Sequence, residues 1–166
     1  MLRRTAAGRD WAHATDAFFA LVDHDRAAFH DPLVLVAARD VAAAAGVTSG
    51  EVADRVFDAL ELRLGSDGID VLYEIVRTRG GSKAAVRAQS LLGRADVMAH
   101  ASPELRITFA LREAPCADKP ALLSRGAAEG DGRTLLVMET VGAACLGKSQ
   151  ALADAERALT QRLRAH

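Results

Sequence analysis

Apolar residues recur along this chain at intervals of three and four positions, which is the spacing of one face of an α-helix. Three longer segments come first, at residues 11–25, 33–45 and 48–64. Few runs are rich enough in β-branched or aromatic residues to predict strands. The later segments are shorter, and each opens at a residue type that often caps a helix: Asp67, Ser82, Ser102, Asp118, Asp131 and Ser149. The pattern predicts an all-α protein of about nine helices.

The joints between the predicted helices are short, and several helices after Asp67 have only about three turns. Such helices need neighbours to be stable, and short joints favour antiparallel pairs. We therefore expect an irregular, HEAT-like stack of antiparallel helix pairs with no fixed-length repeat. The stack should form a single domain over residues 1–166, with acidic N-terminal helices in 1–65 and stacked short pairs in 66–166.

Composition supports the helical prediction. The chain has 166 residues, of which 50% are hydrophobic and only 4% aromatic. The apolar residues are mostly Ala and Leu, which are strong helix formers. A chain of this length and apolar content can fill a core without disulfides or metals. No apolar run is long enough to cross a membrane, and the first residues lack the apolar segment of a secretory signal.

The charges are nearly balanced, with 21 basic and 22 acidic residues and a net charge of −1. A balance of this kind gives no overall field that would attract nucleic acid or anionic lipid. Residues 1–65 are acidic, with 7 Lys/Arg and 10 Asp/Glu, whereas the rest of the chain has 14 and 12. The acidic part of the chain also contains the one stretch that suggests DNA binding.

That stretch, "RDVAAAAGVTSGEVADRV" at residues 39–56, is similar to the helix-turn-helix of LacI-type repressors. The similarity rests on Ala42, on Gly46 as the turn residue and on the Val47-Thr48 pair that follows it. In that family the turn hydroxyl and the first turn of the second helix face the DNA. A helix-turn-helix-like unit at 33–65 is therefore one hypothesis.

A structural turn explains the same stretch without DNA. Thr48 and Glu51 have the spacing of a capping box. DNA contacts come mostly from Arg, Lys, Asn and Gln. The exposed positions of the second helix instead hold three carboxylates and one arginine, within the set Ser49, Gly50, Glu51, Asp54, Arg55 and Asp58. Nucleic acid is thus the disfavoured partner.

A basic stretch, "RTRGGSKAAVRAQSLLGR" at residues 77–94, is the second candidate site. It contains no acidic residue, and its glycine pair precedes a predicted helix whose free N–H groups would favour an anion. We expect an anion or a partner protein to bind at Arg77, Arg79, Ser82, Lys83 and Arg87. The alternative is a solvated helix face after a glycine turn. The stretch lacks the spacing of a phosphate-binding P-loop.

From about Val56 onward, the chain resembles a helical region at the C-terminal end of many myxobacterial proteins, including serine/threonine protein kinases. The resemblance implies an accessory or partner-binding module with no chemistry of its own. That region often carries several cysteines toward its end, a tendency that Cys116 matches. The resemblance is carried by "LGSDGIDVLYEIV" (64–76), "GGSKAAVRAQSLL" (80–92), "ASPELRITFALREAPCADKPALL" (101–123) and "EGDGRTL" (129–135).

The residues predict no catalytic site, metal site or cofactor. The five histidines are scattered rather than clustered at the short spacings of metal ligands. Cys116 and Cys145 are the only cysteines, too few for a disulfide framework, and Cys116 is expected to be an inert thiol. A reduced, cytoplasmic protein is the expectation.

Two functional hypotheses follow. The first is a non-enzymatic, regulatory adaptor that binds another protein, in the manner of a groove that takes a partner helix. The alternative is a nucleic-acid-binding regulator that uses residues 39–56 or 77–94. The sequence assigns no oligomeric state and no role to residues 1–32.

Overall fold

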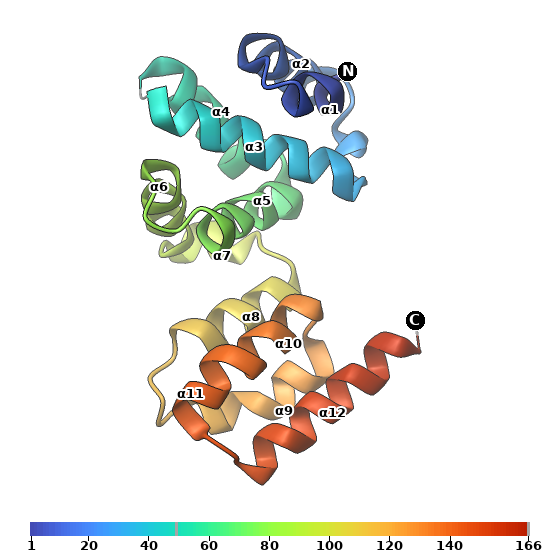
Figure 1. Ribbon diagram of the computed structural model, residues 1–166, viewed down its shortest axis with the longest axis vertical. Coiled ribbons are helices and arrows are strands. Elements are labelled where there is room, and N and C mark those ends of the chain that lie inside the picture. Colours follow the sequence, from blue (N-terminus) through green and yellow to red (C-terminus); the bar gives the residue numbers. More distant parts are fainter. Residues whose placement is uncertain (49, 166) are drawn as a thin grey trace. The chain divides into compact units, whose positions relative to one another are not determined.

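The computed structural model describes residues 1–48 and 50–165. The expectation that Ser49 lies on an exposed recognition helix therefore falls outside the described residues, as does His166. The described residues form helices and no strand (Figure 1), which confirms the predicted all-α fold. The contacts divide the chain into two compact units, Met1–Ala101 and Ser102–His166. This division does not test the prediction of a single domain, but it places Gly65, the expected internal boundary, inside the first unit.

The first unit is built around α3. In Figure 1, α3 runs between the α1–α2 pair and the α5–α6 pair, and it packs against α1, α2, α4, α5 and α6. The helices of this unit are α1 (Leu2–Ala7), α2 (Trp11–His24), a 3-10 turn (Arg26–His30), α3 (Pro32–Thr48), α4 (Glu51–Leu62), α5 (Gly65–Thr78), α6 (Lys83–Leu92) and α7 (Ala95–Ala99).

Aromatic and large aliphatic side chains fill the core of this unit. The rings of Phe18 and Phe29 meet edge to face with their centroids 5.7 Å apart. Phe57 from α4 and Tyr73 from α5 are also fully buried. Burial of one such side chain contributes roughly 1.5–3 kcal/mol. Because these residues come from four different elements, they hold the N-terminal helices and the α4–α5 pair in one unit.

The second unit is a smaller bundle in which α9 packs against α8 and α12. Its elements are α8 (Pro103–Glu113), α9 (Lys119–Glu129), α10 (Gly132–Val137), a π-helical turn (Met138–Gly142), α11 (Ala143–Leu146) and α12 (Gln150–Arg164). A continuous apolar core joins them, formed by Ile107, Leu111, Leu123, Val137, Met138, Leu152, Ala155 and Leu159.

Lys119, the first residue of α9, has a buried side chain whose ammonium reaches the C-terminal end of α8. Its side chain is only 2% exposed, and its ammonium donates hydrogen bonds to the carbonyl oxygens of Leu111 and Arg112, the latter at 3.1 Å. These carbonyls have no partner within the last turn of a helix. Desolvation lowers the pKa of Lys119, and Glu113 opposes this effect. Lys119 therefore has a structural task, the capping of α8.

Several predicted helix starts are confirmed. The hydroxyls of Ser82 and Ser102 accept hydrogen bonds from the backbone N–H groups of Ala85 and Leu105, both at 3.1 Å. Asp131 forms a capping box with Thr134 at the start of α10. The predicted start at Asp67 is wrong, since α5 begins at Gly65. The short helices α1, α7 and α11 were not predicted, because helices of this length carry almost no periodic signal.

The predicted turn at Gly46 is wrong. Gly46 is buried inside α3, and a Cβ atom placed on it would lie only 2.7 Å from the Cβ of Ala84 in α6. The glycine therefore serves the close crossing of two helices. The turn comes later, at Gly50, whose φ of 109° suits glycine.

The predicted capping box of Thr48 and Glu51 is also wrong. The Thr48 hydroxyl donates a hydrogen bond back to the carbonyl oxygen of Ala45 at 2.8 Å, within its own helix. The N-cap of α4 is Gly50, which has no side chain to accept a bond.

The expectation of a free, inert Cys116 is wrong as well. Cys116 and Cys145 form a disulfide that joins the α8–α9 connection to α11, with a Cα–Cα distance of 5.1 Å. Sequence spacing did not reveal the pair, because the fold of the second unit brings together two residues that lie 29 positions apart.

The close crossing of α3 and α6 gives a first prediction. Gly46→Ala should lower the free energy of unfolding of the first unit by about 1–3 kcal/mol, because the added methyl group overpacks the contact with Ala84. Urea unfolding followed by the fluorescence of Trp11, the single tryptophan, would measure it. Gly80→Ala is the control, since a Cβ there would have only one neighbour, at 3.8 Å. A double-mutant cycle with Ala84→Gly should show coupling, and additive effects would contradict this account.

The disulfide gives a second prediction. Opening a link between residues separated by 29 positions should cost the second unit about 3–4 kcal/mol, from the loop-closure entropy of the unfolded chain. Thermal unfolding followed by circular dichroism, with and without a reductant, would measure this loss. Intrinsic fluorescence would not report on the second unit, because Trp11 and Tyr73 both lie in the first unit. The Cys116→Ala/Cys145→Ala variant should unfold at the reduced midpoint whether or not the reductant is present. A reductant effect on that variant would point to another cause.

Candidate functional site

The predicted site residues do not form one cluster. Arg79 and Ser82 line a hollow of about 710 Å³ beside the C-terminal half of α3. Arg77, Lys83 and Arg87 are not among its lining residues. The structure therefore brings only two of the five predicted residues to a concave surface.

Carboxylates from other parts of the fold surround the basic stretch. Arg79 pairs with Asp40 of α3 at 3.0 Å, and Arg87 pairs with Asp54 of α4 at 2.5 Å while its guanidinium lies 4.7 Å from the ring centroid of Phe57. Arg77 pairs with Glu74 one turn earlier in α5 at 2.6 Å. Arg79 and Arg87 thus link the basic stretch to α3 and α4, whereas the pair of Arg77 lies within α5.

The two remaining predicted residues also have clear positions. Ser82 caps α6 through its hydroxyl. Lys83 is exposed and, within residues 1–48 and 50–165, makes no ion pair. Of the five, Lys83 alone is a cation without a carboxylate partner in the described chain.

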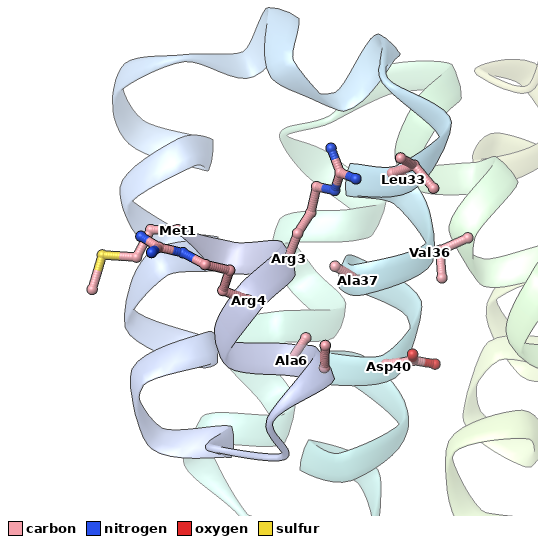
Figure 2. A pocket seen from close by; sticks show the side chains of 9 residues that line it. Met1, Arg3, Arg4, Ala6, Leu33, Val36, Ala37 and Asp40 are labelled. Carbon is pink, nitrogen blue, oxygen red and sulfur yellow. The ribbon is translucent and has the colours of Figure 1, made fainter.

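A second hollow, of about 560 Å³, lies beside the N-terminal half of α3 (Figure 2). Leu33, Val36, Ala37 and Asp40 line it from α3, and Arg3, Arg4, Ala6 and Ala7 line it from α1. The two hollows share Asp40 and the α1 alanines Ala6 and Ala7. Together they form a groove along α3, which we call the α3 groove.

The floor of the α3 groove is an exposed apolar stripe. Leu33 is 51% exposed, Val36 44% and Val47 72%. Ala43 and Ala44 line the same groove between Val36 and Val47. Trp11 is 37% exposed and lines the end of the groove near Val47. These side chains expose to water the apolar surface that a folded helix usually buries.

Arginines line both ends of the groove. Arg3 and Arg4 come from α1 and line the first hollow; Figure 2 shows Arg3 reaching toward the N-terminal end of α3, whereas Arg4 points away from α3. Arg3 pairs loosely with Asp31 at 3.7 Å. Arg9 and Arg79 line the second hollow. The one acidic residue that lines either hollow is Asp40, which also pairs with Arg39 at 2.8 Å.

Arg9 has a backbone conformation that usually belongs to glycine. Its φ is 56°, the one positive value at a non-glycine position of the described chain. It follows the C-cap Gly8 in a Schellman turn, in which the N–H of Arg9 bonds the carbonyl of Ala6 and the N–H of Asp10 bonds the carbonyl of Thr5, both at 3.0 Å. An L-residue in this region costs roughly 1–2 kcal/mol. Arg9 lines the second hollow in this conformation.

The helix-turn-helix hypothesis concerns α3 and α4. Glu51, Asp54, Arg55 and Asp58 are exposed on α4, as predicted. The guanidinium of Arg55 lies 4.6 Å from the ring centroid of Phe19. The exposed side of α4 is thus acidic, and its arginine packs on α2. DNA reading by this unit stays a prediction.

The described residues hold no cluster of metal ligands and no helix that could span a membrane. In residues 1–48 and 50–165, no three His, Cys, Asp or Glu side chains lie together as a metal site. No helix in the same ranges is long and apolar enough to cross a lipid bilayer. The buried ammonium of Lys119 donates a hydrogen bond to a carbonyl at the end of α8.

Comparison of this chain with protein-family models, with curated proteins and with solved structures finds no match. The resemblances to a myxobacterial helical region and to LacI-type repressors therefore stay predictions.

Sequence reasoning missed the main residues of the groove, namely Leu33, Val36, Val47, Arg4 and Arg9. One signal was present. The sequence of α3 carries apolar residues around most of its circumference, which is typical of a central helix. Periodicity cannot say which of those apolar stripes stays uncovered.

The strained turn gives a third prediction. Arg9→Gly should raise the free energy of unfolding of the first unit by about 1 kcal/mol, because glycine removes the penalty of a positive φ. Arg4→Gly, inside α1, is the matched control and should lower it by a similar amount. Urea unfolding followed by Trp11 fluorescence would compare them. A loss of stability in Arg9→Gly would show that the arginine side chain itself stabilises the turn.

Proposed function

We propose that this protein is a non-enzymatic, regulatory adaptor that binds another protein through the α3 groove. The observation that carries the proposal is the stripe of Leu33, Val36 and Val47, which is apolar and exposed although α3 is the central helix of its unit. Exposed apolar surface that lines a groove is typical of interaction sites.

The composition of the groove supports a protein partner. Small residues on α1 and α3 let a partner backbone approach closely, while Trp11 and the arginines are residue types enriched at the energetic centres of interfaces. Burial of the three large side chains of the stripe would supply the hydrophobic part of the affinity. The arginines around them would orient the partner.

The alternative is a nucleic-acid-binding regulator that uses residues 39–56 or 77–94. One observation favours it: Lys83 is exposed and has no carboxylate partner in the described chain. Against it, Arg79 and Arg87 pair with carboxylates of α3 and α4. A phosphate backbone would have to displace those carboxylates, so a protein partner is the better proposal.

Three further features belong to the same proposal. They are the HEAT-like character of the helix pairs, a bacterial source and a cytoplasmic location. The Cys116–Cys145 disulfide opposes the last of these, since such bonds are rare in reducing compartments. Alkylation of thiols in intact cells before lysis would show whether Cys116 and Cys145 are reduced or disulfide-bonded in the cell. Modified cysteines would support the cytoplasm, and unmodified ones would support an oxidising compartment.

Site-specific photocrosslinking tests the proposed function and is our fourth prediction. A photoreactive phenylalanine at Val36 or Val47 should give covalent adducts in the cells that make the protein. Val86 of α6 is the matched control, because it is 66% exposed and does not line the groove.

Nuclease and protease treatment then identify what is attached. Adducts at Val47 that survive nuclease and lose mass with protease support the protein-binding proposal. Adducts that nuclease removes would establish the nucleic-acid alternative. Equal adducts at Val86, or none at Val36 and Val47, would reject the groove as the binding surface.

A further inference from the structure

We propose that the occupant of the α3 groove is an acidic amphipathic helix of a partner protein. This inference rests on the proposed function and adds to it the conformation and the charge of the partner. It is argued from the spacing of the stripe, from the arginines around it and from the way in which a second copy of the chain would fit.

The spacing of the stripe matches a helix. Positions 33, 36, 40, 43 and 47 are separated by three and four residues in alternation, the a/d spacing of a helix seam. Four of them are apolar and the middle one is Asp40. The stripe is about 21 Å long at a rise of 1.5 Å per residue. A partner helix of about four turns would cover it.

Other modes of peptide binding fit less well. Strand addition needs an exposed sheet edge, and the described residues form no strand. Polyproline segments bind between several aromatic rings, whereas Trp11 is the one aromatic residue that lines either hollow. A groove that consists of a helix flanked by alanines is the type that accepts an amphipathic helix.

The charge around the groove selects an acidic partner. Arg3 and Arg9 line the two hollows near opposite ends of the stripe, and Arg3 pairs only loosely, at 3.7 Å, with Asp31. Arg79 also lines the second hollow, but it already pairs with Asp40 in the middle of the stripe. Carboxylates near the two ends of a partner helix would therefore meet Arg3 and Arg9. Complementary charges of this kind set the orientation of a partner and exclude cationic competitors.

The placement of Arg9 is an independent observation in favour of this surface. Its strained backbone, with φ 56°, is unnecessary for the turn itself, which glycine would make without the penalty. Strain that persists at one residue commonly marks a functional position. An arginine that contacts a partner carboxylate would be such a function.

A second copy of this chain is a poor occupant. An antiparallel pairing of two α3 stripes around a twofold axis is centred on residue 40, so Asp40 would face its own copy. The arginines of the two copies would also face one another, and like charges at an interface are unfavourable. The same charges are favourable when the partner is acidic.

Fluorescence anisotropy with synthetic helices tests the inference and is our fifth prediction. The probe is a labelled peptide of about 18 residues with Leu at the a/d spacing, Glu on both flanks and Ala elsewhere. Two further peptides replace every Glu by Gln or by Lys. The full chain should bind the Glu peptide at least tenfold more tightly than the Gln peptide, and should bind the Lys peptide most weakly.

Variants assign the binding to the groove. Val36→Gln/Val47→Gln should weaken binding of the Glu peptide at least tenfold, and Arg3→Gln/Arg9→Gln should remove most of its advantage over the Gln peptide. The controls are Val86→Gln, and Arg106→Gln/Arg164→Gln, which changes two exposed arginines of the second unit. All these residues are exposed, so circular dichroism should show unchanged folding.

Other outcomes would overturn the inference in distinguishable ways. Equal binding of the three peptides, or no binding while Val47 still crosslinks to a protein, rejects the acidic helix and leaves the proposed function in place. A dimer in sedimentation that Val47→Gln abolishes would make a second copy the occupant. Binding of duplex DNA that depends on Arg3 and Arg9 but not on Val47 would reject both proposals.

Discussion

The close packing of α3 against five other helices is the constraint on which the first unit depends. A central helix with so many neighbours needs small side chains where the backbones approach each other. The chain supplies them as Ala38, Ala42 and Ala45, all buried, and as Gly46, where even one methyl group would meet Ala84. This need for space also explains why Gly46 does not form a turn.

The same arrangement creates the α3 groove. The helices around α3 cover most of its circumference, while α1 is too short, at six residues, to cover the rest. The stripe from Leu33 to Val47 is left exposed beside it. The groove is thus a consequence of unequal helix lengths, and the arginines of α1 and of its C-terminal turn are brought to it by the same short helix.

Tertiary contacts determine which basic side chains of this protein are paired. The basic stretch 77–94 has no acidic residue of its own, yet α3 and α4 present Asp40 and Asp54 to Arg79 and Arg87. In the second unit, too, a basic side chain finds its partners in another helix: the ammonium of Lys119 in α9 bonds carbonyls at the end of α8. Local charge in the sequence is therefore a poor guide to the charge that a partner would meet.

The sequence by itself determined the helical class and many helix starts, because periodicity and caps such as Ser82, Ser102 and Asp131 act within a few residues of one another. The apolar circumference of α3 was a further local signal, typical of a central helix. Only the tertiary structure decided the role of Gly46, the pairing of Cys116 with Cys145 and the exposure of Val47. Each of these depends on a residue or a helix that is distant in the sequence. A local sequence pattern does not determine which distant segments pack against a helix, or which face of that helix stays exposed.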